Sequence, residues 1–425
     1  MMVDWPKVNL AGCVELLAGF PFKSEHYTDN PADVALVKGE NVSQGRILWE
    51  ISKRWRVADF AQLQKFELVP GDVVVAMDRP WVPAGLKWAF IREGDSKALL
   101  VQRCARLRSK HESLDQDFLR FVIGGSDFES YVKPITTGVN IPHISGKQIL
   151  DYEFTLPPLP IQRRITDILS AYDELIENNQ RRIRILEDMA RNHYLEWFVH
   201  FCYPGHESIP LVDSRLGPTP QGWEVTTLRA VTTKIGSGAT PRGGKGAYKT
   251  EGIHLIRSQN IYDYSFEFDG LAFIDEQQAA ELDNVMVEKN DILLNITGAS
   301  VARCALVPSY LLPARVNQHV AIVRADPVKA SPFYILDAIN SIQRKQQLLT
   351  LAQGGATREA LTKDTVSNFE IVVPPRSLMK RYDSIARGIH EQREVLLRQT
   401  SNLRRTRDLL LPRLLAGQVK IEVQR

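Results

Sequence analysis

Two short polar segments, one in each half of the chain, carry side chains that form strong hydrogen bonds. They are residues 38–46 and 257–262, and each follows an apolar run that predicts a strand. Guanidinium, ammonium and amide groups of this kind bind phosphate oxygens and the edges of nucleic-acid bases. The candidate contacts in them are Lys38, Asn41, Gln44, Arg46, Arg257, Gln259, Asn260 and Tyr262. Because Asn41 and Asn260 occupy matching positions, the alternative that both amides brace a turn stays open.

A second group of candidates follows other predicted strands and loops. Arg79 and Arg303 come after matched apolar runs and would reach a phosphate group. Thr357 and Arg358 lie in a loop that contains glycine in both halves of the chain. Glycine there indicates either a close approach of the backbone to phosphate or a plain tight turn.

Recognisable catalytic motifs are missing. The two Pro-Pro pairs lack the preceding Asn or Asp and the following aromatic residue that an adenine methyltransferase uses to hold its base. The Gly-rich segment 236–246 fails the phosphate-loop pattern, because Ala239 replaces its first glycine and Gly246 its hydroxyl residue. No histidine pair has the spacing of metal ligands. We therefore expect no catalytic residue and no metal in this chain.

Composition indicates a folded protein in a reducing compartment. The chain has 425 residues, 44% of them hydrophobic, and a net charge of +3, which neither requires nor excludes a nucleic-acid partner. Its four cysteines are far apart and predict neither a disulfide framework nor a zinc site. The first residues lack an apolar signal segment, and no run is long enough to span a bilayer. These features predict a cytoplasmic protein without a membrane partner.

The chain is an internal repeat. Residues 152–158 reappear as residues 369–375, which is 217 positions later, and residues 34–38 and 71–75 reappear 219 positions later. A period of this length is too great for a solenoid, so each copy should be a domain with its own core. Each copy contains short β-branched strands and short helices, and ends in a Pro-Pro pair followed by a long helical pattern. The predicted fold class is therefore α/β (α+β), with two tandem pseudo-symmetric domains.

The two long helical segments carry heptad repeats. A helix of about 40 residues spans roughly 60 Å and needs a partner along its apolar stripe. The simplest partner is the helix of the other copy, packed as an antiparallel coiled coil; the alternative is that each helix folds back on its own domain. The predicted seam residues are Ile165, Ile168, Tyr172, Leu175, Asn179 and Leu186 in the first helix and Tyr382, Ile385, Ile389, Leu396, Leu403 and Leu410 in the second.

The second helix is strongly basic. Ten arginines and lysines lie between Arg376 and Arg413, opposed by four acidic residues. Such a run is usually a solvated face. The other explanation is an acidic partner subunit or DNA phosphate nearby.

This architecture resembles the specificity subunits of type I restriction–modification systems. The resemblance covers essentially the whole chain. It rests on the duplicated domain-plus-helix order, the Pro-Pro pair at each junction, and residues 156–165, 216–224, 290–298, 317–321 and 411–418. The first copy departs from the second after the matched strand, where residues 76–79 stand in place of residues 295–298.

The resemblance implies a division into two target-recognition domains and two spacer helices. These would be residues 1–157, 158–203, 204–373 and 374–425. It also implies a non-catalytic subunit that binds double-stranded DNA at a split, asymmetric target and docks two modification subunits on its helices. Restriction subunits would complete the complex, and S-adenosylmethionine, ATP and Mg would be bound by the partner subunits, with none bound by this chain.

Two other functions remain open from the sequence. One is a coiled-coil adaptor that organises protein partners and never contacts DNA. The other is the same specificity role in a system that methylates DNA without restricting it.

Overall fold

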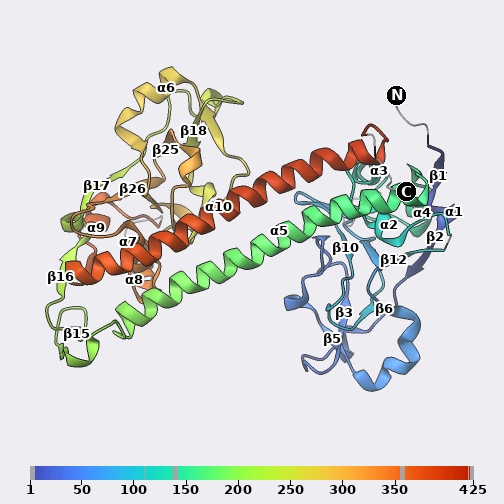
Figure 1. The fold of residues 1–425 in the computed structure, drawn as a ribbon, viewed down its shortest axis with the longest axis horizontal. Coiled ribbons are helices and arrows are strands. Elements are labelled where there is room, and N and C mark those ends of the chain that lie inside the picture. Colours follow the sequence, from blue (N-terminus) through green and yellow to red (C-terminus); the bar gives the residue numbers. More distant parts are fainter. Residues whose placement is uncertain (1–4, 111, 137–141, 355–358, 420, 422–425) are drawn as a thin grey trace. The chain divides into compact units, whose positions relative to one another are not determined.

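The structure, a computed structural model, describes residues 5–110, 112–136, 142–354, 359–419 and 421. The chain divides into two compact units (Figure 1). The first unit is Met1–Asn178 with Gln399–Arg425, and the second is Asn179–Arg398. Each unit contains one sheet-rich domain and part of both long helices. The sequence assigned each long helix to a segment of its own, and those segment boundaries stay a prediction.

The first unit contains two main sheets. A five-stranded sheet has the order β2-β12-β7-β10-β4, and a four-stranded sheet has the order β5-β3-β11-β6. The strands are β1 (Lys7–Asn9), β2 (Val14–Ala18), β3 (Val34–Val37), β4 (Gln44–Gly45), β5 (Arg54–Trp55), β6 (Glu67–Leu68), β7 (Val73–Ala76), β8 (Trp81–Val82), β9 (Gly85–Leu86), β10 (Trp88–Phe90), β11 (Ala98–Leu100), β12 (Cys104–Ser109) and β13 (Glu153–Thr155).

Helices cover one face of the five-stranded sheet. They are α1 (Leu10–Cys13), α2 (Gln116–Ile123), α3 (Ser126–Ile135) and α4 (Gly146–Leu150). All four residues of β7 are buried, which is the continuous apolar pattern of a strand covered on both faces. The core between sheet and helices includes Phe118 and Phe128.

The second unit repeats this arrangement. Its four-stranded sheets have the orders β17-β26-β23-β24 and β21-β18-β25-β22. The strands are β14 (Leu211–Val212), β15 (Thr219–Pro220), β16 (Glu224–Thr227), β17 (Thr232–Ser237), β18 (Ile253–Ile256), β19 (Ile261–Tyr262), β20 (Ser265–Phe266), β21 (Ala272–Ile274), β22 (Met286–Val287), β23 (Ile292–Asn295), β24 (Cys304–Leu306), β25 (Ala314–Val316), β26 (Val320–Ala325) and β27 (Glu370–Val373).

The helices of the second unit are α6 (Glu276–Glu281), α7 (Pro332–Asn340), α8 (Ile342–Gln353) and α9 (Lys363–Ser367). Helices α7 and α8 are separate because Ser341 has extended backbone between them. Its side chain bonds to the carbonyl of Ala338 (2.8 Å), which satisfies one of the free acceptors at the end of α7.

Matched strands and ion pairs confirm the duplication. In the larger sheet of each unit two strands pair antiparallel, β7 with β12 and β23 with β26. In the smaller sheet two strands pair parallel, β3 with β11 and β18 with β25. A buried carboxylate directly precedes β7 in the first unit and β23 in the second. Asp72 pairs with Arg108 (2.8 Å to Nη2), and Asp291 pairs with Arg324 (2.8 Å to Nη2). The other role of each carboxylate is to accept a backbone N–H in the preceding turn. The predicted α/β class and tandem domains are therefore confirmed.

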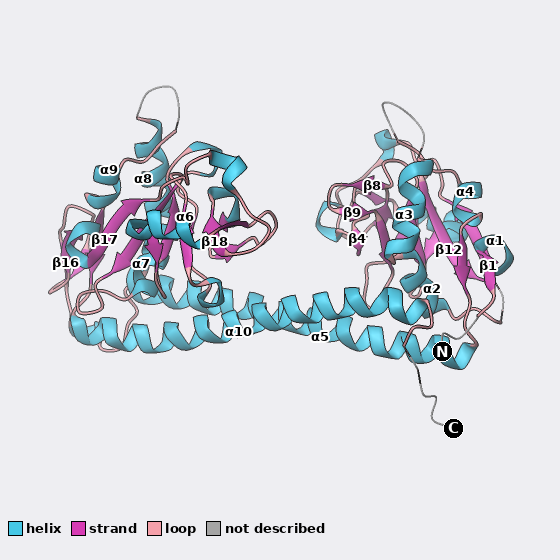
Figure 2. Cartoon of the chain, turned by 90° about the horizontal axis from the view of Figure 1, so that it is seen from above, coloured by secondary structure: helices cyan, strands magenta, loops and turns pink. Residues whose placement is uncertain are grey.

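The two long helices are α5 (Leu159–Tyr194), which continues into a π turn (Leu195–Val199), and α10 (Arg376–Leu415). Each starts directly after a Pro-Pro pair, which disfavours helix at the residue before it. In the second unit the helices run antiparallel (Figure 2): His193 of α5 stacks on Tyr382 of α10, and Glu187 pairs with Arg393 further along. The predicted antiparallel pairing is confirmed there.

The predicted heptad on α5 is half correct. Ile165, Asn179 and Leu186 are buried, and Tyr172 is half-buried, as expected. The predicted seam has a second row of residues, the second seam line, through Ile168 and Leu175. Leu175, however, is 53% exposed and Ile168 only half-buried, so the second seam line does not pass through them. The buried residues of that line each lie one position later: Leu169, Ile176, Ile183 and Ala190.

The same one-residue correction applies to α10. Tyr382, Ile389 and Leu396 are buried and Leu403 and Leu410 half-buried, whereas Ile385 is 45% exposed. The buried position is Ala386 instead. The physical reason lies in the domain cores: on α5, Ile165 and Leu169 are both fully buried in the first unit's core, and this four-residue spacing fixes the rotation of the helix.

Candidate nucleic-acid interface

The turn after β3 is held by a buried amide. Asn41 Oδ1 accepts a hydrogen bond from the backbone N–H of Lys38 (2.8 Å), and Nδ2 donates to the carbonyl of Leu36 (2.9 Å). The side chain is fully buried. The prediction that Asn41 contacts DNA is therefore wrong, because the polar atoms of its side chain already form hydrogen bonds inside the protein. The alternative, that Asn41 braces a turn, is confirmed.

Asn260 does the same in the second unit. Its Oδ1 accepts from the N–H of Arg257 (3.1 Å), and its Nδ2 donates to the carbonyl of Glu267 (2.9 Å). It is also fully buried, so it too is a turn residue and not a contact. The two amides fix the polar segments that begin at Lys38 and Arg257.

Three other candidates of the first segment are accessible. Lys38 lies 2.8 Å from the carboxylate of Glu40, and its side chain is 21% exposed. Gln44 and Arg46 are exposed on and beside the short strand β4. Their accessibility leaves all three as candidate contacts.

Basic side chains gather where β7 ends and β12 begins. The N–H of Met77 donates to the carbonyl of Arg103 (2.8 Å), so Arg103 lies beside the residues that follow β7. The Asp78 carboxylate is 3.6 Å from Arg103 Nε and 2.6 Å from His143 Nδ1. The predicted candidate Arg79 is exposed in the same loop.

Lys87 joins this strand-end cluster to the turn of residues 38–41. Its Nζ donates to the carbonyl of Gly39. Burial lowers the pKa of Lys87, and the nearby Arg79 lowers it further. The strand end of the first unit therefore combines Lys38, Arg79, Lys87, Arg103 and His143, a set whose cations would attract phosphate.

The second unit has a different set of side chains at the corresponding place. The guanidinium of Arg303 lies 4.6 Å from the ring centre of Tyr262, which is 43% exposed. Arg257 donates to the carbonyl of Gly270 and lies over the ring of Tyr248, so its guanidinium already has contacts within the second unit. Gln259 is exposed.

A histidine occupies the position that Arg103 has in the first unit. The N–H of Ile296 donates to the carbonyl of His319 (3.0 Å), as Met77 does to Arg103. His319 Nδ1 lies 2.6 Å from the hydroxyl of Thr297. The framework is thus shared, whereas the side chains at the strand end differ.

Sequence reasoning missed Arg103, His143, Thr297 and His319. His319 was visible only as part of a family-like segment, and Arg103 lies in a first copy that diverges from the second. The one usable signal was position, because both residues directly precede a long strand. Thr357 and Arg358 lie outside the residues that the structure describes, so they stay predictions.

Comparison with known proteins finds similarity to type I specificity subunits. Residues 2–188 match a family model described as Type I restriction modification DNA specificity domain. The MjaIX specificity subunit of Methanocaldococcus jannaschii is 23% identical over 72% of this chain and 69% of its own length. The HindI specificity subunit of Haemophilus influenzae is 21% identical over 98% of this chain and 100% of its own length.

The fold agrees with those matches. The crystal structure of a type I restriction–modification system S subunit from M. genitalium has a TM-score of 0.64 at 15% identity, over 97% of this chain and 96% of that one. This chain is similar to type I specificity subunits in sequence and in fold. The resemblance inferred from the repeat and the Pro-Pro junctions is confirmed.

The two long helices have a partly polar seam. The second seam line of α10 continues from Ala386 through Arg393 to Arg407. Arg393 Nε lies 2.8 Å from Glu187 in the second unit, and Arg407 Nη1 lies 2.7 Å from Asp173 in the first. Polar pairs at such positions fix register more than they add stability.

A buried carboxyl joins α7 to α10 in the second unit. Asp337 is fully buried and accepts a hydrogen bond from the hydroxyl of Tyr382. Burial raises the pKa of Asp337 to about 7, although the hydrogen bonds of Tyr382 and Tyr264 oppose the shift. This carboxyl is thus protonated in the folded protein at pH values where it would be ionised in an unfolded chain.

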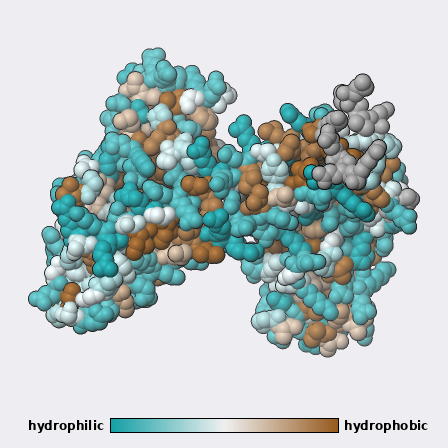
Figure 3. Space-filling model, in the orientation of Figure 1, coloured by the Kyte–Doolittle hydropathy of each residue, from teal (hydrophilic) through white to brown (hydrophobic). Residues whose placement is uncertain are grey.

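Apolar side chains remain exposed on both long helices. Figure 3 shows hydrophobic patches among hydrophilic side chains on one face of the molecule. The exposed apolar residues of the helices are Leu175, Ile185, Met189, Ile385, Val395 and Leu409. Single exposed apolar residues are common, but their repeated occurrence on two helices suits a protein partner.

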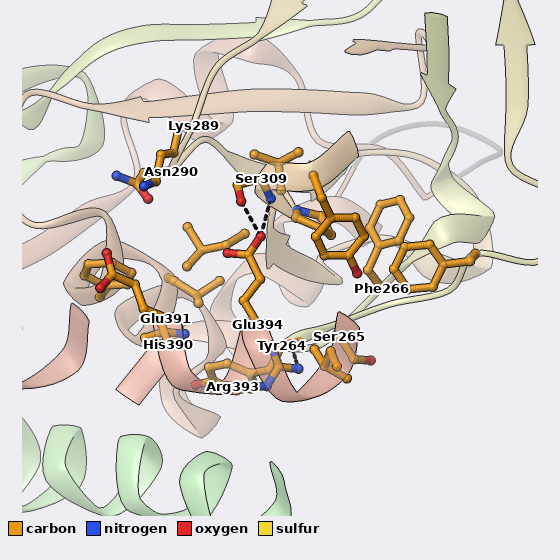
Figure 4. A pocket seen from close by; sticks show the side chains of 18 residues that line it. Tyr264, Ser265, Phe266, Lys289, Asn290, Ser309, His390, Glu391, Arg393 and Glu394 are labelled. Atoms are coloured by element: carbon orange, nitrogen blue, oxygen red, sulfur yellow. Dashed lines mark hydrogen bonds between the residues drawn. The ribbon is translucent and has the colours of Figure 1, made fainter. Parts of the chain in front are cut away.

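A small cavity of about 90 Å³ lies beside α10 in the second unit (Figure 4). Glu394 and Ser309 line the cavity, and the Glu394 carboxylate accepts hydrogen bonds from the N–H (2.6 Å) and hydroxyl (2.5 Å) of Ser309. Arg393 donates to the carbonyl of Tyr264 (2.5 Å). These contacts hold the helix against the domain, so the cavity is part of that junction.

The described part of the chain contains no cluster of three metal-ligating side chains. Nor does any helix within the described ranges have the length and apolar character needed to cross a membrane.

Proposed function

We propose that this chain selects the DNA sequence for a type I restriction–modification complex. The domain of the first unit would contact one half of a split target, and the domain of the second unit the other. The observation that carries the proposal is the pair of equivalent strand ends with unlike side chains: Arg103 beside Asp78 in one copy, His319 beside Thr297 in the other. Equal frameworks with unequal polar groups suit an asymmetric target.

The long helices would dock two modification subunits. Their exposed apolar residues and the basic face of α10 support this role. Restriction subunits would join the same complex. S-adenosylmethionine, ATP and Mg would be used by those partners, so the chain itself would contribute recognition and no chemical step.

Methylation by the reconstituted complex tests the proposal. The chain is combined with its modification subunits and S-adenosylmethionine, and methylated adenines are mapped across a genomic DNA library. We expect one interrupted, asymmetric motif, and binding that weakens steeply with salt because phosphate contacts release counterions. Methyl transfer by the chain alone, or methylation without any motif, would contradict the proposal.

A coiled-coil adaptor is the alternative from another class. It would give a stable complex with the modification subunits but no sequence-selective shift of DNA. The basic strand end of the first unit favours DNA, because an adaptor has no use for it. A system that methylates without restricting would give the same motif, and adding the restriction subunits with ATP would separate the two cases.

A further inference from the structure

Two arginines of the first unit have left-handed backbone at the same end of the large sheet. Arg79 follows β7 and has φ 45°, and Arg103 precedes β12 and has φ 68°. The strands β7 and β12 are paired neighbours, so both residues lie at one edge of the sheet. Left-handed backbone is costly for residues other than glycine.

The second unit has glycine at one of the two equivalent positions and no left-handed backbone at the other. Gly298, which follows β23 as Arg79 follows β7, has φ 75°. His319, which precedes β26 as Arg103 precedes β12, is absent from the left-handed residues among the described ones. The first unit therefore keeps an arginine at a position where its own duplicate has glycine.

Packing gives no reason to keep these two side chains. The Arg103 side chain is 61% exposed, and its contact is with Asp78 through Nε. Arg79 is exposed, and its guanidinium has no hydrogen-bond or ion-pair partner among the described residues. Backbone strain at exposed polar residues is typical of functional sites.

We propose that Arg79 and Arg103 are specificity-determining residues of the first recognition domain, and that His319 has the corresponding position in the second. The inference rests on the proposed function and deepens it. A guanidinium fits the O6 and N7 atoms of guanine. Because Asp78 contacts Arg103 at Nε, the two terminal nitrogens stay available for such a pair. The first half-site should therefore contain guanine where Arg103 binds.

The left-handed backbone allows a variant that removes the side chain without disturbing the fold. Arg79→Gly and Arg103→Gly place glycine where the backbone favours it, so the melting temperature should be unchanged or higher. In the assembled complex, methylation of a library with randomised half-sites should lose discrimination at one position of one half-site by about 5- to 150-fold, as expected for one bidentate base contact. The other half-site should be unchanged.

Matched variants separate base contact from charge. Lys110→Ala removes an exposed cation at the opposite end of β12 and should leave the motif intact. Arg103→Lys keeps the charge but loses the two-pronged geometry, so discrimination should fall while the salt dependence of binding is kept. His319→Gln should alter only the other half-site.

Two results would overturn the inference alone. One is an unchanged motif in both glycine variants. The other is DNA binding that the glycine variants weaken equally for all sequences and that Arg103→Lys restores. A wild-type complex without a split motif would instead overturn the proposed function itself.

Discussion

At the scale of single residues, identical residue types serve different purposes in this protein. Asn41 and Asn260 are of a residue type that often contacts DNA, yet the side-chain amide of each forms a hydrogen bond with the backbone of its own turn. Arg103 and His319 were not expected, yet they occupy equivalent positions at the strand ends, where Arg103 is exposed and His319 half-buried. Exposure and free hydrogen-bonding capacity, not residue type, separate the two groups.

Replacement of Asn41 by alanine should destabilise the first unit without altering base preference. The variant leaves the N–H of Lys38 without a partner and removes one of the two side-chain hydrogen bonds to the carbonyl of Leu36, at a cost of about 1–3 kcal/mol. Urea unfolding monitors the loss. The matched variant Gln44→Ala, on an exposed side chain, should change the unfolding free energy by less than about 0.5 kcal/mol. Equal stability of the two variants would contradict the turn role.

At the scale of elements, the sequence predicted which helices pair but not their rotation. Adjacent apolar residues such as Ile168 and Leu169, or Leu175 and Ile176, supply two possible seam lines. A heptad pattern alone does not choose between them, because both lines keep a seven-residue repeat. The choice is made by tertiary packing of Leu169 in the domain core, which no local pattern contains. In the same way, the strand-end cluster depends on pairing between distant strands.

The corrected rotation makes a direct prediction on α10. Ile389→Ala removes a buried side chain from the seam of the second unit and should cost about 2–4 kcal/mol. Ile385→Ala changes the same residue type one turn earlier on an exposed face, and should cost less than about 1 kcal/mol. Thermal or urea unfolding of the two variants compares them directly. Equal costs for the two variants would instead place Ile385 in the seam with Ile389, as the heptad predicted from the sequence did.

The link between α7 and α10 should respond to pH. The folded pKa of Asp337 is raised to about 7 from an ordinary value of 3.8, so the folded state binds more protons between these values. Stability from this group is therefore greatest below pH 4 and is lost as pH rises to about 7, by up to about 4 kcal/mol. Asp337→Asn removes the titration. Between pH 5 and pH 8 the wild type should lose stability relative to this variant; a constant difference in unfolding free energy would contradict it.

At the scale of the whole molecule, duplication separates recognition from assembly. Matched strand orders, buried Asp–Arg pairs and turn amides give both domains one framework, while the strand ends carry different polar groups. The sequence established this organisation because a repeat is visible at any distance along the chain. It could not identify the exposed contacts, because the framework and the contacts use the same residue types.

A domain exchange tests this separation. If residues 1–157 are replaced by the corresponding domain of a type I specificity subunit, α5 and α10 and the second domain are retained. One half of the methylated motif should then change and the other half should stay, because each domain has its own core and its own strand-end residues. Mapping of methylated adenines in cells that express the complex provides the measurement. Change in both halves would mean that the two domains do not recognise DNA independently.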